Sequence, residues 1–361
     1  AIYSKVSPVT PPLNHDLTGK VALVTGGSSG IGRALAKKLA SLGCTVVITS
    51  RSLDRARKEA ASIGQTATIT DDGKHHNNGR IIGMELNLND FDSVRSFADD
   101  FRRDFTRLHY LVENAGMAVT DGSSPSPSHT EEGVEHLYAA NYLGHFLLTQ
   151  LLLPTMVTTY GETNRKPRVV AVSSTMHWFH DSNLTSLLPR GGYWSRGIST
   201  VDQTKFWKMA EQYGNTKFLQ VAMCFEIARR IPEVIATPVI PGFVRTDIGH
   251  SKRDGNDKGG LGISSAIRGA VTPERGIETA LFSLLDDSAE ESGKYIVQPY
   301  WTPMHRANSV FRNLDIMIWE GAFQRLTWGV RRWRPHPDAF DETFAAALWT
   351  ESVEVVKRYI D

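Results

Sequence analysis

Residues 20–32 read KVALVTGGSSGIG and contain the strongest indication of the fold in the sequence. The apolar run before Thr25 has the length and composition of a strand buried in a parallel sheet. The glycine-rich turn leads into RALAKKLASLG (33–43), a helical pattern that ends on Gly43. A strand, a glycine turn and a helix in this order predict a dinucleotide site, because glycines admit backbone N–H groups to a pyrophosphate at the helix N-terminus.

Strand-like and helix-like stretches then alternate along the chain. The further strand-like runs are TVVITS (45–50), RIIGMEL (80–86), LHYLVE (108–113) and RVVAVS (168–173). This alternation predicts an α/β fold with a doubly wound parallel sheet of Rossmann type. We expect an N-terminal tail over 1–16, one Rossmann-type domain over 17–300, and a C-terminal helical extension over 301–361.

Composition excludes several classes of protein. The 361 residues carry 40 Lys+Arg against 39 Asp+Glu, so nothing attracts the whole chain to nucleic acid. Cys44 and Cys224 are too few for a disulfide framework, and no Cys/His cluster has metal-ligand spacing. No apolar run reaches the roughly 20 residues that cross a bilayer. We therefore expect a cytoplasmic protein, while Ala at position 1 leaves open an upstream segment.

The end of the second predicted strand selects the nucleotide. Thr49-Ser50-Arg51 has no carboxylate where an NAD site usually places an acid for the ribose 2′-hydroxyl. Arg51 can fork onto a 2′-phosphate, Ser50 can donate to it, and Arg33 can approach from the other side. Solvated surface charge is the alternative for each arginine. The sequence favours NADP(H) over NAD(H).

Tyr213 and Lys217 form the Tyr-x-x-x-Lys pattern of this chain. We expect the pair to open a helix, with both side chains on one face. A tyrosine hydroxyl with its usual pKa of about 10 is a poor acid-base group at neutral pH, and an ammonium one turn away lowers that pKa. The pattern occurs often by chance, so its interpretation as a site depends on the other residues that accompany it. Ser173-Ser174 ends the predicted fifth strand, and Asn141 lies in a predicted helix.

Five motifs occur in an order that resembles the classical short-chain dehydrogenase/reductase family: TGGSSGIG (25–32), ENAG (113–116), VSS (172–174), YGNTK (213–217) and PGFVRT (241–246). Four further stretches resemble its retinol-dehydrogenase-like branch: TEEGVEHLYAANYLGHFLLTQLLLP (130–154), TPERGIETALFSLL (272–285), SGKYI (292–296) and ALWTES (347–352).

The resemblance implies a role for each residue of a catalytic tetrad. Ser174 would hydrogen-bond the substrate oxygen and Tyr213 would exchange the proton. Lys217 would bind the nicotinamide ribose and lower the Tyr213 pKa, and Asn141 would hold a water linking Lys217 to solvent. With the residues argued above, the candidates for cofactor binding are Gly26, Ser28, Ser29, Gly30, Ile31, Gly32, Arg33, Ser50, Arg51, Asn87, Leu88, Asn114, Ala115, Gly116, Tyr213, Lys217, Pro241, Gly242, Val244 and Thr246.

Three features depart from the family pattern. Glu113 replaces the first Asn of Asn-Asn-Ala-Gly, a change that we expect to be tolerated. Asn87 stands where an Asp commonly meets the adenine, and its amide can still donate or accept. Extra chain over 187–207 separates Ser174 from Tyr213, either as a border of the substrate site or as a surface excursion.

A segment over 301–335 is not explained by the resemblance. Its apolar residues recur at spacings of 3 and 4, which predicts an amphipathic helix ending before Pro335, with arginines near its end. Three interpretations stay open: packing over the substrate mouth or core, peripheral contact with a membrane through 311–334, or a basic partner site. The apolar stripe is Ile316, Trp319, Phe323, Leu326, Val330 and Trp333.

The function that these features predict is an NADP(H)-dependent oxidoreductase acting on the carbonyl or alcohol carbon of a sizeable apolar molecule, such as a retinoid, steroid, lipid aldehyde or polyketide-like ketone. The alternative is an NADP(H)-binding sensor or scaffold that engages a membrane or partner through 301–335; the intact tetrad favours the enzyme. Family analogy suggests a homodimer, which the C-terminal segment could block. The size of the substrate rests on aromatic residues expected near its site: Trp178, Phe179, Tyr193, Trp194, Phe206 and Trp207.

Overall fold

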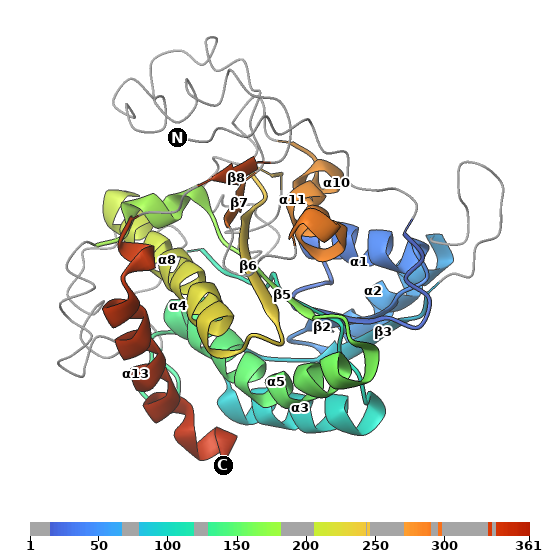
Figure 1. The fold of residues 1–361 in the computed structure, drawn as a ribbon, viewed down its shortest axis with the longest axis horizontal. Helices are drawn as coiled ribbons and strands as arrows, with labels where there is room; N and C mark the ends of the chain where they lie inside the picture. Colours follow the sequence, from blue (N-terminus) through green and yellow to red (C-terminus); the bar gives the residue numbers. More distant parts are fainter. Residues whose placement is uncertain are drawn as a thin grey trace, which may run out of the picture.

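An eight-stranded sheet forms the centre of the computed structural model (Figure 1), with strand order β3-β2-β1-β4-β5-β6-β7-β8. The structure describes residues 15–66, 79–118, 129–181, 206–242, 244–245, 271–289, 295–297, 331–333 and 337–361. The strands are β1 (Val21–Val24), β2 (Thr45–Ser50), β3 (Ile81–Glu85), β4 (Tyr110–Glu113), β5 (Arg168–Val172), β6 (Ile235–Ile240), β7 (Tyr295–Val297) and β8 (Arg331–Trp333).

The pairing confirms the doubly wound parallel sheet. Neighbouring strands pair in parallel from β3 through β7, and β8 adds an antiparallel edge. The chain moves outward from β1 to β3 in one direction and from β4 to β7 in the other. The strand order therefore reverses between β1 and β4, and ligands of open α/β sheets bind at such a point, beyond the carboxyl ends of the strands.

Helices cover both faces of the sheet (Figure 1). One face carries α1 (Gly30–Ser41), α2 (Leu53–Thr66), α10 (Pro273–Gly276) and α11 (Glu278–Leu285). The other carries α3 (Phe91–Asp104), α4 (His136–Tyr138), the π-helix η1 (Ala139–Leu143), α5 (Gly144–Thr163), α8 (Phe206–Arg230) and α13 (Glu342–Ile360). Short 3₁₀ helices are η2 (Thr175–Phe179), η4 (Asp287–Ala289) and η6 (Pro337–Phe340). Each face encloses an apolar core of its own.

The C-terminal helix α13 packs on the same face as α3, α5 and α8. Asp341 caps its N-terminus, because its side chain accepts from the N–H groups of Thr343 and Phe344 at 2.9 and 3.1 Å. The Tyr142 and Ser352 hydroxyls are 2.9 Å apart in the core between η1 and α13. Residues near the end of the chain thus complete the core on this side.

Two expectations about helices are wrong. Tyr213 does not open a helix, since α8 begins at Phe206, and the stretch WKMAEQ that precedes Tyr213 consists mainly of good helix formers. Arg331–Trp333 is a strand and not the end of an amphipathic helix, because it pairs with β7. The rest of that helix, residues 316–330, and the loop over 187–205 lie outside the described residues.

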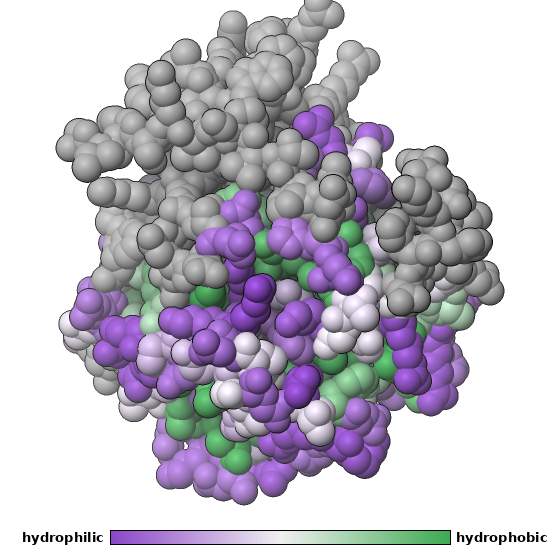
Figure 2. All heavy atoms as spheres, turned by 45° about the vertical axis from the view of Figure 1, so that its right-hand side comes forward, coloured by the Kyte–Doolittle hydropathy of each residue, from purple (hydrophilic) through white to green (hydrophobic). Residues whose placement is uncertain are grey.

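The described surface is mainly hydrophilic on the face shown in Figure 2, where apolar atoms form small separate patches. Among the described residues, Met117 and Val157 are the exposed large hydrophobic side chains. None of the described helices combines the length and the apolar composition that a membrane span requires. Cys44 and Cys224 are buried thiols without a disulfide.

Candidate active site

The glycine turn after β1 is organised around one buried hydroxyl. Thr25 Oγ1 accepts from the N–H groups of Asn114 and Ala115, both at 2.9 Å, and so joins the ends of β1 and β4. The Asn114 amide donates to the Thr25 carbonyl at 2.9 Å. Gly26 has a positive φ of 62°, and a Cβ there would lie 2.9 Å from the Ala115 backbone. The turn therefore needs glycine for its conformation and for the close approach of β4.

Helix α1 begins in a form suited to an anion. Its N-cap residue Ser29 makes no side-chain cap hydrogen bond, and the first turn has no acidic residue. The backbone N–H groups and positive dipole end are thus left to a ligand. A Cβ at Gly32 would lie 2.4 Å from the Asn114 amide nitrogen, so glycine allows α1 to pack against β4. The predicted residues here are Ser28, which is buried, and Ser29, Gly30 and Ile31, which are partly buried.

The two predicted phosphate arginines differ in their surroundings. Arg51 follows β2, is exposed, and forms no ion pair within the described part of the chain. Partly buried Ser50 precedes it. Arg33 instead donates to the Glu59 carboxylate at 3.0 Å and to the Ser62 hydroxyl at 3.3 Å, which draws its guanidinium to α2.

Asn87 and Leu88 follow β3 at the same edge of the sheet. Asn87 Oδ1 accepts from the Asn89 N–H at 3.2 Å, and its NH₂ group remains a donor that no described residue engages. Leu88 is buried. Beyond β6, Pro241 is buried and Gly242 adopts a positive φ of 93°, while Val244 forms a bridge with Val271. Thr246 lies outside the described residues.

Asn141 lies in the π-helix η1 and is fully buried. Its side chain pairs with both backbone groups of Met117, accepting at 2.8 Å and donating at 2.9 Å, and also donates to Thr216 Oγ1 at 3.0 Å. The backbone carbonyl of Asn141 is 3.3 Å from His145 Nδ1. Asn141 thus joins the segment after β4 to α8, and a Cβ on Gly116 would touch both Asn141 and Lys217.

Ser174, Tyr213 and Lys217 converge beyond the carboxyl end of β5. The Ser174 hydroxyl lies near enough to Tyr213 to lower the pKa of its phenol. Lys217 Nζ lies 5.6 Å from the centroid of the Tyr213 ring and donates to the Val172 carbonyl at 2.9 Å. The Ser173 hydroxyl donates to the Lys217 carbonyl at 2.9 Å and ties α8 to β5.

Burial dominates the acid-base properties of this group. Desolvation raises the pKa of Tyr213 to about 12, and the Ser174 hydrogen bond opposes that shift. Desolvation lowers the pKa of Lys217 to about 7, and the charge of Glu113 opposes it. A charged Lys217 beside the ring favours the phenolate, so the proton affinity of Tyr213 depends on the charge of Lys217.

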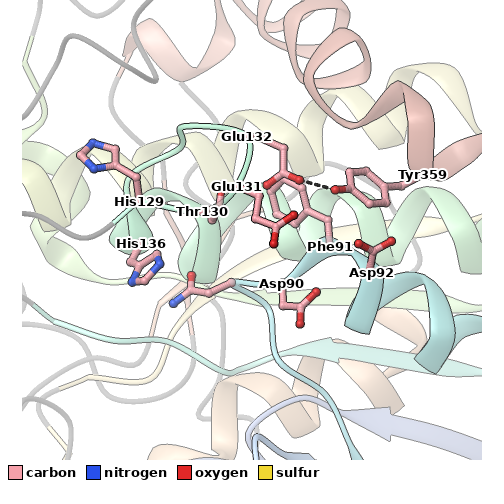
Figure 3. A pocket seen from close by; sticks show the side chains of 10 residues that line it. Asp90, Phe91, Asp92, His129, Thr130, Glu131, Glu132, His136 and Tyr359 are labelled. Atoms are coloured by element: carbon pink, nitrogen blue, oxygen red, sulfur yellow. Dashed lines mark hydrogen bonds between the residues drawn. The ribbon is translucent and has the colours of Figure 1, made fainter.

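Figure 3 shows a cavity of about 340 Å³ elsewhere on the molecule, between the start of α3, the segment before α4 and the end of α13. Acidic side chains dominate its wall, including Asp90, Asp92, Glu131 and Glu132, and the Tyr359 hydroxyl bonds to Glu132. None of the predicted site residues lines it.

Sequence reasoning missed several residues that shape the site. Thr25 and Ser173 were within quoted motifs, yet their roles as hydrogen-bond centres depend on strands distant in the chain. His145, whose Nε2 is 2.9 Å from Thr25 Oγ1, had only its position one turn after Asn141 as a signal. Gln220 accepts from Lys217 Nζ at 2.8 Å and lies at i+3 on the same helix, a spacing that could have revealed it.

Comparisons with known proteins establish the family. The chain matches the short chain dehydrogenase family model over residues 20–182. A short-chain dehydrogenase/reductase of Armillaria gallica is 30% identical over 257 residues, which cover 68% of this chain and 74% of that protein. The chain belongs to the short-chain dehydrogenase/reductase family, a family of oxidoreductases.

Other relatives place it in the retinol-dehydrogenase-like branch, as the motifs predicted. Mouse retinol dehydrogenase 14 is 31% identical over 242 residues (66% of this chain, 64% of that protein). Mouse polyprenol dehydrogenase is 38% identical over 183 residues (51% of this chain, 50% of that protein). The chain thus spans about half to two thirds of the length of these relatives.

A solved structure shows the same fold over nearly the whole chain. An uncharacterised protein of Mycobacterium paratuberculosis superposes with a TM-score of 0.64 and 23% identity, covering 97% of this chain and 98% of that one.

Proposed function

We propose that this protein is an NADP(H)-dependent oxidoreductase that transfers a hydride between nicotinamide and the carbonyl or alcohol carbon of a sizeable apolar substrate. The observation that carries the proposal is the convergence of Ser174, Tyr213 and Lys217 at one point beyond β5, where ligands of open α/β sheets bind. The Ser174 hydroxyl lowers the pKa of Tyr213, and the ammonium lies one turn along α8 from the phenol.

The residues present fit a bound dinucleotide. The N-terminus of α1 offers uncapped N–H groups and no acidic side chain, which suits a pyrophosphate. Asn114 and Thr25 hold the turn before it in place. Gly116 keeps the space beside Asn141 and Lys217 free of a side chain. When bound there, NADPH would supply the hydride.

The protein's own residues would manage the proton. In carbonyl reduction, the Ser174 and Tyr213 hydroxyls would donate hydrogen bonds to the substrate oxygen, and Tyr213 would release its proton to that oxygen. In alcohol oxidation, the Tyr213 phenolate would take the proton back. A positive Lys217 makes the first step easier by stabilising the phenolate that forms.

Arg51 and Ser50 carry the preference for the phosphorylated nucleotide. Arg51 is exposed at the end of β2, forms no ion pair with another described residue, and has the planar fork that binds a phosphate with two hydrogen bonds. Arg33 is already engaged by Glu59 and Ser62, so we assign it the smaller share.

The apolar nature of the substrate rests on two observations. Met117, whose backbone N–H donates to the Asn141 side chain, is one of the exposed large hydrophobic residues among those described. The relatives are named for retinol and polyprenol, which are both long apolar alcohols. We propose an alcohol or aldehyde of this class.

Titration with NADPH and with NADH, followed by quenching of tryptophan fluorescence, tests the cofactor assignment. Arg51→Asp should weaken NADPH binding by about 10- to 150-fold, which corresponds to roughly 1.5–3 kcal/mol for a charge-assisted hydrogen bond. Arg55→Asp, at an exposed position in the first turn of α2, makes the same change of charge and serves as the control. Equal NADPH affinity in the Arg51 variant and the wild type would contradict the assignment.

A further inference from the structure

Glu113 is a fully buried acid at the end of β4, in a position that the mechanism above does not use. Its Oε1 accepts from the Thr149 hydroxyl on α5 at 2.5 Å. Its Oε2 is also buried and has no hydrogen-bond partner among the described residues. A carboxyl group with one satisfied oxygen in an apolar core is costly, so such a group calls for a function.

A second buried polar group without a hydrogen-bond partner among the described residues lies on α8. Gln220 is fully buried, and its Oε1 accepts from Lys217 Nζ at 2.8 Å. Its amide nitrogen Nε2 lacks a partner within the described chain. The protein therefore buries an unpaired amide donor on Gln220 and an unpaired carboxyl acceptor on Glu113.

Sheet pairing and a hydrogen bond bring the two groups close together: Glu113 pairs with Ala171 of β5, and Lys217 donates to the carbonyl of the next residue, Val172. The charge of Glu113 acts on both Lys217 and Cys224, which lie three residues before and four residues after Gln220. Residues at these spacings share one face of a helix, so Gln220 lies on the face of α8 directed at Glu113. The cluster contains two other titratable groups. The charge of Glu113 raises the pKa of Tyr142, and the charge of Lys217 lowers the pKa of His145.

We propose that Glu113 is a positioning residue for Lys217, which it reaches through a water that bridges its free carboxyl oxygen and the Gln220 amide nitrogen. This deepens the proposed function and rests on it. The link fixes the orientation of the Gln220 amide, so that its oxygen faces the ammonium. Once the pH exceeds the pKa of Glu113, which burial raises to about 8, its carboxylate favours the charged state of Lys217, and charged Lys217 favours the Tyr213 phenolate. The line Glu113–Gln220–Lys217–Tyr213 would then set the pH at which the enzyme acts.

The pH profile of alcohol oxidation tests this line. Glu113→Gln keeps the shape but removes the charge, so Lys217 loses its proton more easily and Tyr213 holds its own more tightly. The rising limb of kcat/KM should move to higher pH by about one unit or more, the effect of one neighbouring opposite charge. Substrate KM measured on the high-pH plateau should change little, because Glu113 does not reach the substrate.

A swap variant separates charge from packing. Glu113→Gln combined with Gln220→Glu exchanges the amide and the carboxylate without changing the number or size of the groups. It should return the limb to the wild-type pH or below, because the acid now contacts Lys217 directly. Thr279→Val removes a buried hydroxyl on the opposite face of the sheet that has no hydrogen-bond partner among the described residues, and it should leave the profile unchanged. A limb unmoved by Glu113→Gln, or equally displaced in the swap variant, would overturn the proposal.

A measurement on the free protein separates this proposal from the proposed function. Selective ¹³C labelling of the lysine ε-carbons, with the Lys217 signal assigned through Lys217→Met, follows the titration of Lys217 without substrate. Its pKa should fall in Glu113→Gln and recover in the swap variant. That result without any dehydrogenase activity would contradict the proposed function alone, whereas an unchanged Lys217 titration in an active enzyme would refute the role of Glu113.

Discussion

The two ends of the site contain different kinds of polar group: neutral hydrogen-bonding groups at the phosphate end and buried ionisable groups at the proton end. At the phosphate end, neutral groups are fully engaged: Thr25 Oγ1 accepts two N–H groups, and the Asn114 amide donates to the glycine turn. At the proton end, Lys217 and Glu113 are ionisable, buried and only partly satisfied. Binding a fixed anion needs a rigid set of donors. Moving a proton needs groups whose two charge states are close in free energy, and burial brings them close.

The largest effect that would sharpen this contrast is expected at Tyr213. Tyr213→Phe removes the hydroxyl that exchanges the proton, so turnover with NADPH should fall by about 10²- to 10⁴-fold. NADPH affinity should be retained, because the phosphate end is untouched. Steady-state rates together with fluorescence titration check both parts. A variant that keeps its activity would show that the proton is handled elsewhere.

A substitution at the phosphate end should lower the stability of the folded protein. Thr25→Val preserves shape but leaves the Ala115 N–H, and in part the Asn114 N–H, without an acceptor in a buried site. We expect a loss of roughly 1–3 kcal/mol in the free energy of unfolding, measured by denaturant titration. Thr237→Val is the matched control on β6, since its buried hydroxyl has no partner among the described residues. Equal losses in both variants would contradict the role of Thr25.

At the proton end, the ionisation of Glu113 should make the free energy of unfolding depend on pH. Burial raises the pKa of Glu113 to about 8, above its value in the unfolded chain. Between those two values the native state holds a proton that the unfolded chain has released, so this residue makes stability fall as pH rises. Glu113→Gln should remove a slope of up to about 1.4 kcal/mol per pH unit.

The window from about pH 5 to about pH 7 isolates Glu113, because the pKa of Lys217, lowered to about 7, leaves that group protonated in both states below it. The difference in unfolding free energy between wild type and Glu113→Gln, followed across this window, gives the slope. Parallel curves for the two proteins would mean that Glu113 does not titrate there.

The smallest effect is expected at Arg33. Its guanidinium is held by Glu59 and partly exposed, so a contact with the 2′-phosphate would be a solvent-exposed ion pair, a type of contact that contributes about 0–1 kcal/mol. Arg33→Ala should therefore weaken NADPH binding by less than about fivefold, well below the loss in Arg51→Asp. Similar losses in the two variants, in parallel NADPH titrations, would show that both arginines hold the 2′-phosphate.

The sequence predicts the phosphate end better than the proton end, for a physical reason. A glycine turn between a strand and a helix is local, so 20–32 defines it, and Asn114 follows from the end of a recognisable strand. The i, i+4 relation of Tyr213 and Lys217 is also local. The partners of Lys217 are Val172 and Gln220, and its electrostatic environment includes Glu113 from β4; tertiary packing brings these together. From the sequence we expect only that Glu113 is a tolerated substitution, because no local pattern reveals that its carboxyl group is buried.

The C-terminal part illustrates the same limit. Hydrophobic spacing predicted a helix through Trp333, but three residues at that end pair with β7, and a pairing of this kind depends on a distant partner. The final helix carries its own cap at Asp341. Its packing against α5 through Trp349 and Phe146, whose ring centroids are 5.1 Å apart, required the fold.

Transfer of deuterium is the most direct test of the central claim that Tyr213 supports hydride transfer from NADPH. The wild-type protein is incubated with NADPH deuterated at the transferable position of nicotinamide C4 and with a long apolar aldehyde, and the alcohol formed is analysed by mass spectrometry. We expect one deuterium on the carbinol carbon with the wild type and almost no product with Tyr213→Phe. Saturating NADPH binding with no labelled alcohol from any apolar aldehyde, or equal labelling by the Tyr213 variant, would contradict it.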